Sequence, residues 1–246
     1  MRNLLLTICY DGANYHGWQI QQNAISVQQV FQQALQRIIG DSPDIKGCSR
    51  TDTAVHAREF CISFHTEHSI PCARLVGALN HFLPKDIAVL SCREVPEDFH
   101  ARYSCLGKEY EYCIWNERVR NPFLIGRALH YWYPLDLDRL NRAASQLVGP
   151  HDFTSFCAVD ARKRGNMTRT VTCAHWKREG GMVSFTVAAD GFLYHMVRIM
   201  VGTMLRVAEG KLEPNDTEKI LAACDRKAAG PTAPPQGLYL NRVFYK

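Results

Sequence analysis

Apolar and polar residues alternate over several short stretches in the first half of the chain, and alternation at a period of two predicts β-strands. Between these stretches, apolar residues recur at helical spacing. Ser26 followed by Gln29 forms a capping box that predicts a helix start, and Gly40 predicts its end. The expected elements are a strand at 3–10, a helix from 27 to about 39, a strand at 60–65, a helix at about 72–83 and a strand at 87–95.

The second half repeats this order loosely. Tyr110, Tyr112 and Ile114 alternate on a predicted strand. A helix from about residue 137 closes at Gly149. The remaining expected elements are a hairpin of strands 171–177 and 182–187, a long helix at about 193–209, a shorter helix at about 214–224 and a last strand at 238–244.

Mixed strands and helices without strict βαβ alternation predict an α+β fold of two halves, residues 1–105 and 106–246. An apolar content of 46% with 22% charged residues is typical of a globular protein. No apolar run approaches the ~18 residues of a membrane span, and no signal peptide is recognisable. We therefore expect a cytoplasmic protein.

The net charge of +5 is unevenly distributed. Residues 1–105 carry 9 Lys or Arg against 10 Asp or Glu, whereas residues 106–246 carry 20 against 14. A basic second half is compatible with a polyanionic partner, although a solvated basic face without a partner is the commoner case. The ten cysteines form no C-x-x-C pair, which favours free thiols and predicts no zinc site. No nucleotide-binding fingerprint occurs either, so we expect no cofactor.

The chemistry that stands out lies in residues 48–57, CSRTDTAVHA, where Arg50 and Asp52 are two positions apart. A neighbouring guanidinium keeps a carboxylate ionised and able to act as nucleophile or base without a metal. Two interpretations are open: a catalytic carboxylate, and an ordinary ion pair within a loop. Spacing alone favours the ion pair.

These residues resemble the signature of the tRNA pseudouridine synthase A family, Gly-Arg-Thr-Asp-x-Gly-Val-His-Ala. Ser49 and Ala54 stand where that signature has glycine, and they matter if either glycine supplies a positive φ or a close backbone approach. An opening motif that includes Tyr10 and Trp18 also matches the family. It is either an RNA-contacting loop or a packed loop in which Trp18 is buried.

Further motifs of the same family follow along the chain. By resemblance, Tyr110 stacks on the target base, Arg198 pairs with Asp52, and Leu238 packs near the base. Without the resemblance, Tyr110 reads as a core residue and Arg198 as a solvated helix residue. Gly202, one turn beyond Arg198, allows a backbone to approach closely. A basic cluster matches a further part of the family pattern and is a candidate phosphate clamp or a merely solvated loop; it comprises Arg162, Lys163, Arg164 and Arg169.

The resemblance implies two similar α/β subdomains with mainly antiparallel sheets around a central active-site cleft, with helices packed on the sheet. It implies a cofactor-free, metal-free isomerisation of uridine to pseudouridine at positions 38, 39 and 40 of the tRNA anticodon stem-loop. Asp52 is then the nucleophile or base, acting on either the ribose or the uracil, and Arg50 fills the space left by the flipped nucleotide. The enzyme is expected to be a homodimer.

Two alternatives to this enzyme are open. One is an RNA-binding protein or tRNA chaperone of the same fold that has lost activity, for which Ser49 and Ala54 are the only support. The other is an acid/base glycosidase, which needs a second cooperating carboxylate that the sequence does not mark out.

Overall fold

The computed structural model describes residues 1–158 and 165–246, which form two compact units. The first unit holds Met1–Leu106 together with Tyr239–Lys246, and the second holds Gly107–Leu238. The sequence predicted a boundary after residue 105 with all later residues in the second half, but Tyr239–Lys246 belongs to the first unit. The last residues return to the first unit because the final strand pairs with a strand there.

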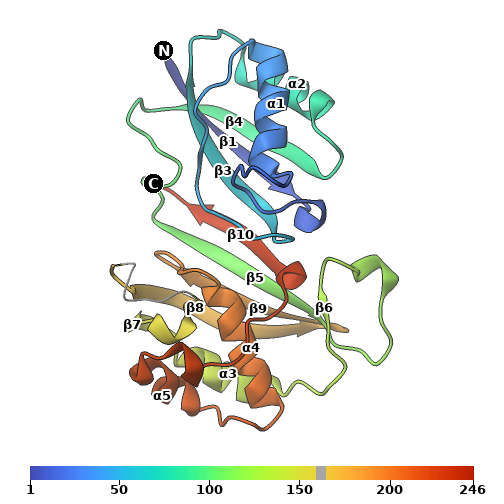
Figure 1. The fold of residues 1–246 in the computed structure, drawn as a ribbon, viewed down its shortest axis with the longest axis vertical. Helices are drawn as coiled ribbons and strands as arrows, with labels where there is room; N and C mark the ends of the chain where they lie inside the picture. The colour runs from blue at the N-terminus through green and yellow to red at the C-terminus, as the bar shows by residue number, and fades with distance from the viewer. Residues whose placement is uncertain (159–164) are drawn as a thin grey trace. The chain divides into compact units, whose positions relative to one another are not determined.

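The sheet of the first unit is mainly antiparallel (Figure 1). Its central strand β1 lies between β4 and β3, in an order β4-β1-β3-β10 with the short β2 also beside β3. The last strand, β10, pairs with β3 in parallel. The strands are β1 (Arg2–Tyr10), β2 (Lys46–Gly47), β3 (His56–Thr66), β4 (Ile87–Val95) and β10 (Leu238–Phe244).

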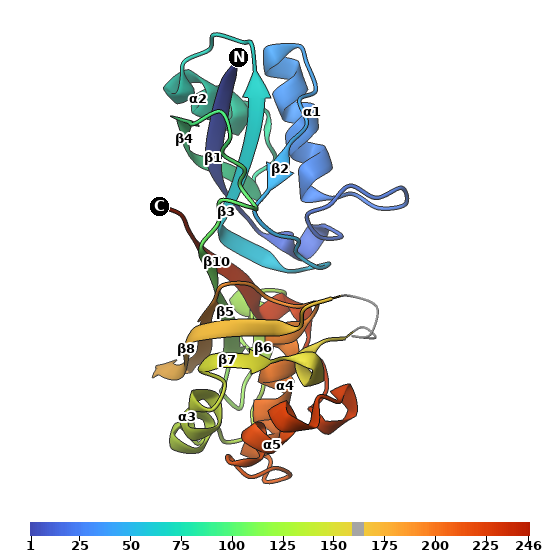
Figure 2. The same ribbon diagram turned by 90° about the vertical axis from the view of Figure 1, so that its left-hand side faces the viewer.

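Two helices cover one face of this sheet, as Figures 1 and 2 show together. Helix α1 (Val27–Ile39) begins at Ser26, whose hydroxyl accepts a hydrogen bond from the Gln29 amide, and it ends at Gly40 with φ 72°. The predicted helix start at Ser26 and the glycine stop are therefore confirmed. Helix α2 (Cys72–Phe82) packs against β4 and α1. Between helices and sheet lies a core of fully buried residues, among them Phe31, Leu35, Leu4, Leu6 and Phe64.

In the second unit the main strands pair antiparallel in the order β5-β9-β8-β7, and the short β6 lies parallel to β5. Helix α3 packs on β8, and α4 packs on α3 and β5 (Figure 2). Tyr112, Phe185 and Leu140 are among the fully buried residues of its core. The elements are β5 (Gly107–Trp115), β6 (Leu129–His130), α3 (Leu137–Ser145), β7 (Gly149–Asp152), β8 (Thr168–Glu179), β9 (Met182–Ala189), α4 (Met196–Ala208) and α5 (Asp216–Ala223).

Most predicted elements and the α+β class are confirmed. The helix expected from about residue 193 begins only at Met196, because His195 before it has φ 61° and interrupts helical geometry. The strand expected at 60–65 is longer and begins at His56. The sequence did not reveal β2, β6 and β7, which are two to four residues long. Single 3₁₀ turns complete the described chain: Gly12–Asn14, Pro122–Leu124, Thr154–Phe156, Arg226–Ala228 and Pro235–Gly237.

Candidate active site

Asp52 lies in the segment of residues 48–57, here called the Asp52 loop, whose last two residues are the first two of strand β3. Its carbonyl accepts a hydrogen bond from the Val55 amide at 3.2 Å, which closes a four-residue turn. The third residue of that turn, Ala54, has φ 60°, whereas Thr53 before it has a negative φ. A positive φ at the third position is the pattern of a type II turn, which normally requires glycine. Asp52 is therefore the first residue of a tight, strained turn, and its side chain is half-buried.

The two departures from the family signature thus have different consequences. Ala54 occupies a left-handed conformation that costs a non-glycine residue about 1–2 kcal/mol. Ser49 has no positive φ, so its side chain imposes no such strain. Of the two positions where the signature has glycine, only position 54 has a backbone conformation that other residues avoid.

The Asp52 loop is packed against the opening motif of the chain through two glycines. A Cβ on Gly12 would lie 2.0 Å from the Val55 carbonyl oxygen, and a Cβ on Gly17 would lie 2.2 Å from that of Thr51. No real Cβ contact is this short, so only glycine allows the two backbones to meet. Backbone hydrogen bonds join them: Trp18 donates to Thr51 at 3.2 Å, and Ala54 donates to Tyr15 at 3.1 Å.

Side chains of the opening motif support the loop from inside the first unit. The Tyr10 and Thr51 hydroxyls are 2.8 Å apart, and both residues are buried. Trp18 is 3% exposed and packs on Phe60 with ring centroids 4.2 Å apart. Of the two interpretations of this motif, the packed loop is correct for Trp18. In this position the indole supports the Asp52 loop from within the first unit.

Arg50 does not form the local ion pair that the sequence allowed. Its side chain is exposed, and it makes no hydrogen bond or ion pair with any residue that the structure describes. The structural interpretation of the Arg50 and Asp52 spacing is therefore wrong. The guanidinium is available to a ligand beside a half-buried carboxylate.

His56 anchors the end of the loop at the start of β3. Its Nδ1 lies 3.0 Å from both the Asp11 carboxylate and the Gly12 amide nitrogen. Its ring stacks on Tyr239 of β10 at 4.6 Å, and the Arg58 guanidinium lies over the same tyrosine ring, also at 4.6 Å. The imidazole is almost completely buried, which fits an anchoring side chain better than a catalytic one.

Tyr110 lies on β5 in the second unit and is 6% exposed. The edge of Phe192 approaches it at 80° with ring centroids 4.9 Å apart. Phe192 belongs to the motif that precedes α4, so two segments that resemble the family's active-site motifs are in contact here. Such edge-to-face pairs contribute about 0.5–1.5 kcal/mol beyond burial and fix the ring's position.

Arg198 lies on α4 and is clamped against the loop that precedes β10. Its Nε donates to the Ala233 carbonyl at 2.8 Å, while the Ala233 amide donates to the Arg198 carbonyl at 3.0 Å. The loop reaches the helix because Gly202 has no side chain: a Cβ there would lie 1.8 Å from the Pro231 oxygen. The predicted close approach at Gly202 is confirmed. Arg198 is half-buried and not a freely solvated helix residue.

The same loop is fixed at its other end by Tyr112, whose hydroxyl donates to the Pro234 carbonyl at 2.7 Å. Burial raises the pKa of this tyrosine above its ordinary value, with a smaller opposing influence from the Arg198 charge. The phenol therefore stays protonated and keeps donating. Leu238 follows directly and is 6% exposed.

Three of the four residues in the basic cluster, Arg162, Lys163 and Arg164, lie outside the described residues. The fourth, Arg169 on β8, donates to the carbonyls of Asn166 and Thr168 at 3.1 and 2.6 Å. A Cβ on Gly191 would lie 3.3 Å from its Nε, so the arginine side chain crosses the glycine of the motif that precedes α4.

Within the described part of the chain, no group of three or more His, Cys, Asp or Glu side chains is arranged to hold a metal ion. All ten cysteines are free thiols. None of the described helices has both the length and the apolar character that crossing a membrane demands.

Comparison with known proteins shows the family to which this chain belongs. A family model described as tRNA pseudouridine synthase matches residues 7–104 and 143–246. The tRNA pseudouridine synthase A of Moorella thermoacetica is 47% identical over 244 residues, 98% of this chain and 99% of the relative. Those of Acetivibrio thermocellus and Thermoanaerobacter sp. (strain X514) are 44% and 43% identical over 245 residues, the full length of both chains. A solved Cbf5-Nop10-Gar1 complex matches 96% of this chain and 57% of its own at 12% identity and a TM-score of 0.36, too weakly to bear on the argument.

The chain belongs to the tRNA pseudouridine synthase family. It is an enzyme of the isomerase class with a mixed α/β fold whose sheets are largely antiparallel. The sequence had not indicated the pairing of Tyr10 with Thr51 or the support that Tyr112 gives to Pro234. Neither contact has a local signal, because each joins segments far apart in the chain.

Proposed function

We propose that this enzyme converts uridine to pseudouridine at positions 38, 39 and 40 of the tRNA anticodon stem-loop, with Asp52 as its nucleophile or base. The observation that carries the proposal is the Asp52 turn itself. A half-buried carboxylate stands on a strained turn that two glycines and a buried hydroxyl pair hold in place. Strain of this kind persists where the surrounding structure fixes a residue for chemistry.

The reaction is an isomerisation that needs no oxidant or metal. The bond between ribose C1′ and uracil N1 breaks, the base rotates, and a bond forms from C1′ to C5. The proton on C5 leaves to water, and N1 gains a proton. Asp52 assists by attacking either the ribose or the uracil ring.

The other candidate residues take supporting roles. Arg50, which has no partner among the described residues, enters the space left when the target nucleotide flips out. Flipping costs a few kcal/mol, which stacking on Tyr110 and phosphate contacts offset. Arg198 keeps Asp52 ionised, and Leu238 packs near the base. The basic cluster binds phosphates; its members are Arg162, Lys163, Arg164 and Arg169.

The enzyme acts in the cytoplasm as a homodimer on which one tRNA contacts both subunits. Sedimentation of the purified protein with and without tRNA measures this directly. A monomeric species at working concentration in both samples contradicts the dimer.

The second candidate function is an RNA-binding protein of the same fold with weakened catalysis, whose support is that Ser49 and Ala54 stand where the family signature has glycine. Tritium release separates the two. Unmodified tRNA labelled at C5 of uridine loses tritium to water if pseudouridine forms. Replacing the uridines at 38, 39 and 40 by cytidine one at a time should remove the release in proportion. Binding without release supports the second candidate, and release that survives all three replacements refutes the proposed positions.

A further inference from the structure

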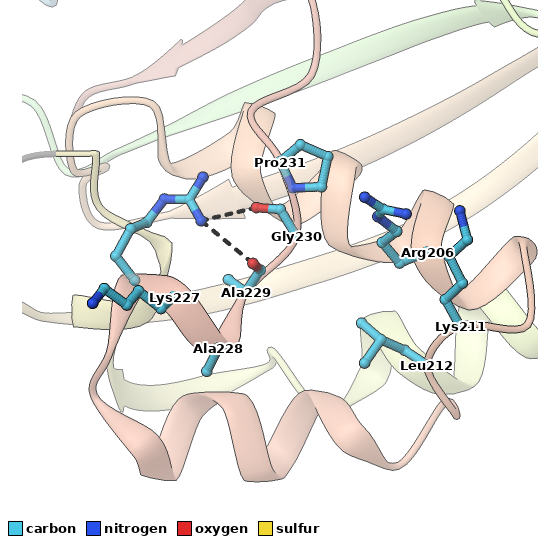
Figure 3. Close-up of a pocket in the computed structure, with 9 residues that line it drawn as sticks. Arg206, Lys211, Leu212, Lys227, Ala228, Ala229, Gly230 and Pro231 are labelled. Atoms are coloured by element: carbon cyan, nitrogen blue, oxygen red, sulfur yellow. Dashed lines mark hydrogen bonds between the residues drawn. The ribbon is translucent and has the colours of Figure 1, made fainter.

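The second unit contains a hollow of about 510 Å³ with a basic lining. Its cationic side chains are Arg206, Lys211, Arg226 and Lys227, and its backbone wall is the segment 228–231. Figure 3 shows this segment running between Lys227 on one side and Arg206 with Lys211 on the other. We call this feature the basic hollow.

The cations of the basic hollow are only partly neutralised. Arg206 and Lys211 share one carboxylate, Glu209, at 3.3 and 2.7 Å. The hydrogen bond from Lys211 and the nearby Arg206 hold the pKa of Glu209 below its ordinary value, so it counts as one negative charge. Two cations against one carboxylate leave a net +1 on this side.

No carboxylate among the described residues pairs with Arg226. Its guanidinium donates to the Gly230 carbonyl at 2.9 Å, to the Ala229 carbonyl at 3.4 Å and to the Thr232 hydroxyl at 3.3 Å. It is half-buried, and burial lowers its pKa from the ordinary value. An arginine stays charged under all ordinary conditions, so this is a partly desolvated cation whose partners are all neutral.

Lys227 adds a fourth charge. It is exposed, and its ammonium has no hydrogen bond or ion pair within the described residues. The nearest carboxylate in the chain, that of Asp225, instead accepts the Lys227 backbone amide and caps the short turn that follows. Arg226 and Lys227 thus place two cationic side chains on this side of the segment, with the Asp225 carboxylate next to them in the sequence.

We propose that the basic hollow binds the phosphate backbone of the tRNA substrate and takes at least two phosphates of one strand. The proposal rests on the proposed function, because it takes its ligand from the reaction. Cationic side chains line the basic hollow on both sides of the segment 228–231 (Figure 3). They fit a ligand whose negative charges repeat along a strand, and contacts of this kind fix register without reading sequence.

The wall of the basic hollow is also the loop that clamps Arg198. The Gly230 amide donates to the Thr203 hydroxyl at 2.9 Å on α4, and Ala233 binds Arg198 a short distance along the same loop. An RNA strand seated in the hollow therefore contacts the segment that holds a proposed active-site arginine.

The test is a double variant, Lys211→Ala with Lys227→Ala, which leaves Arg226 and its support of the loop intact. The matched control is Lys177→Ala with Lys219→Ala. It removes the same charge from exposed lysines of the same unit that do not line the hollow. Binding of unmodified tRNA is measured from about 50 to 200 mM salt, where each phosphate contact contributes about 0.7–0.9 to the slope of log K against log salt.

We expect the hollow variant to bind tRNA on the order of tenfold to a hundredfold more weakly at about 0.1 M salt. The slope of log K against log salt should decrease by the amount that about one to two phosphate contacts contribute. The control should keep the wild-type slope. Equal slopes for the two variants overturn the proposal. A second result would also overturn it. If inorganic phosphate at constant ionic strength displaces tRNA from the wild-type protein but not from the hollow variant, the hollow is a site for one phosphate.

Tritium release from the same preparations keeps the two proposals apart. A wild-type protein that releases no tritium but shows the predicted difference in slope fails as the proposed enzyme while retaining the RNA site. If the wild-type protein releases tritium but the two variants have equal slopes, the proposed function stands and the proposed phosphate site is refuted.

Discussion

The hydroxyl groups of Tyr10 and Thr51 lie 2.8 Å apart in the interior of the first unit. Tyr10 is the last residue of β1, and Thr51 is the neighbour of Asp52 in the chain. This contact ties the backbone beside the proposed nucleophile to a rigid strand. Asp52 is thus held by the core of the first unit, although it stands on a loop.

Removing this hydroxyl pair should reduce the rate of the reaction more than substrate binding. Tyr10→Phe leaves the buried Thr51 hydroxyl without this partner, at a cost of about 1–3 kcal/mol in the free energy of unfolding. We expect kcat to fall while KM for tRNA changes little. Tyr15→Phe is the matched control, because it removes a 2.6 Å hydrogen bond to Asp86 in the same unit. If both variants lower kcat equally, the pair has only a general structural role.

Ala54→Gly should stabilise the protein. It relieves a φ of 60° at the third position of the Asp52 turn, and we expect a gain of about 0.5–1 kcal/mol after the entropy that glycine adds to the unfolded chain. Ser49→Gly, which relieves no positive φ, should instead lose stability. Urea denaturation of the three proteins measures this, and a destabilised Ala54→Gly variant contradicts the assigned turn.

Two helical glycines should respond to alanine with opposite signs. Gly77→Ala on the exposed side of α2 meets no atom within 4 Å and should add up to about 1 kcal/mol of stability through helix propensity. Gly202→Ala on α4 places a methyl group 1.8 Å from the Pro231 oxygen and should cost about 1–3 kcal/mol or more. Thermal melting distinguishes them. A neutral Gly202→Ala variant would show that the loop does not touch the helix.

Stability should fall at alkaline pH partly through one thiol. Burial raises the pKa of Cys61 from 9.0 to about 11. The folded protein therefore keeps a proton that the unfolded chain loses, and the stability gained below pH 9 is lost as pH rises through about 11. Cys61→Ala should make the decline in unfolding free energy over this interval shallower. The two proteins are compared by the slope of unfolding free energy against pH. The packing lost in the variant lowers stability equally at every pH and so does not affect this slope. An unchanged slope contradicts the assignment.

The sequence predicted those parts of the fold that depend on local pattern. The start of α1 at Ser26 and its end at Gly40 follow from capping chemistry within a few residues. The late start of α4 did not, because the helical periodicity continues through His195 and gives no sign of its positive φ. Short strands such as β7 have too few residues for alternation to be recognised.

For the candidate site, the sequence identified the residues but not their environment. Arg50 and Asp52 stood out, yet their spacing suggested an ion pair that the fold does not form. Trp18 had two interpretations, and only its contact with Phe60 decided between them. The basic hollow was not predicted, because its four cations come from the ends of separate helices and turns.

In the proposed function, Asp52 is the nucleophile or base that converts uridine to pseudouridine. The most direct test of this role is tritium release from tRNA labelled at C5 of uridine, comparing the wild type with Asp52→Asn, which keeps the size of the side chain and removes its charge. We expect the wild type to release tritium, the variant to release none above background, and both to bind tRNA with similar affinity. Release by Asp52→Asn at a rate near that of the wild type would contradict this role.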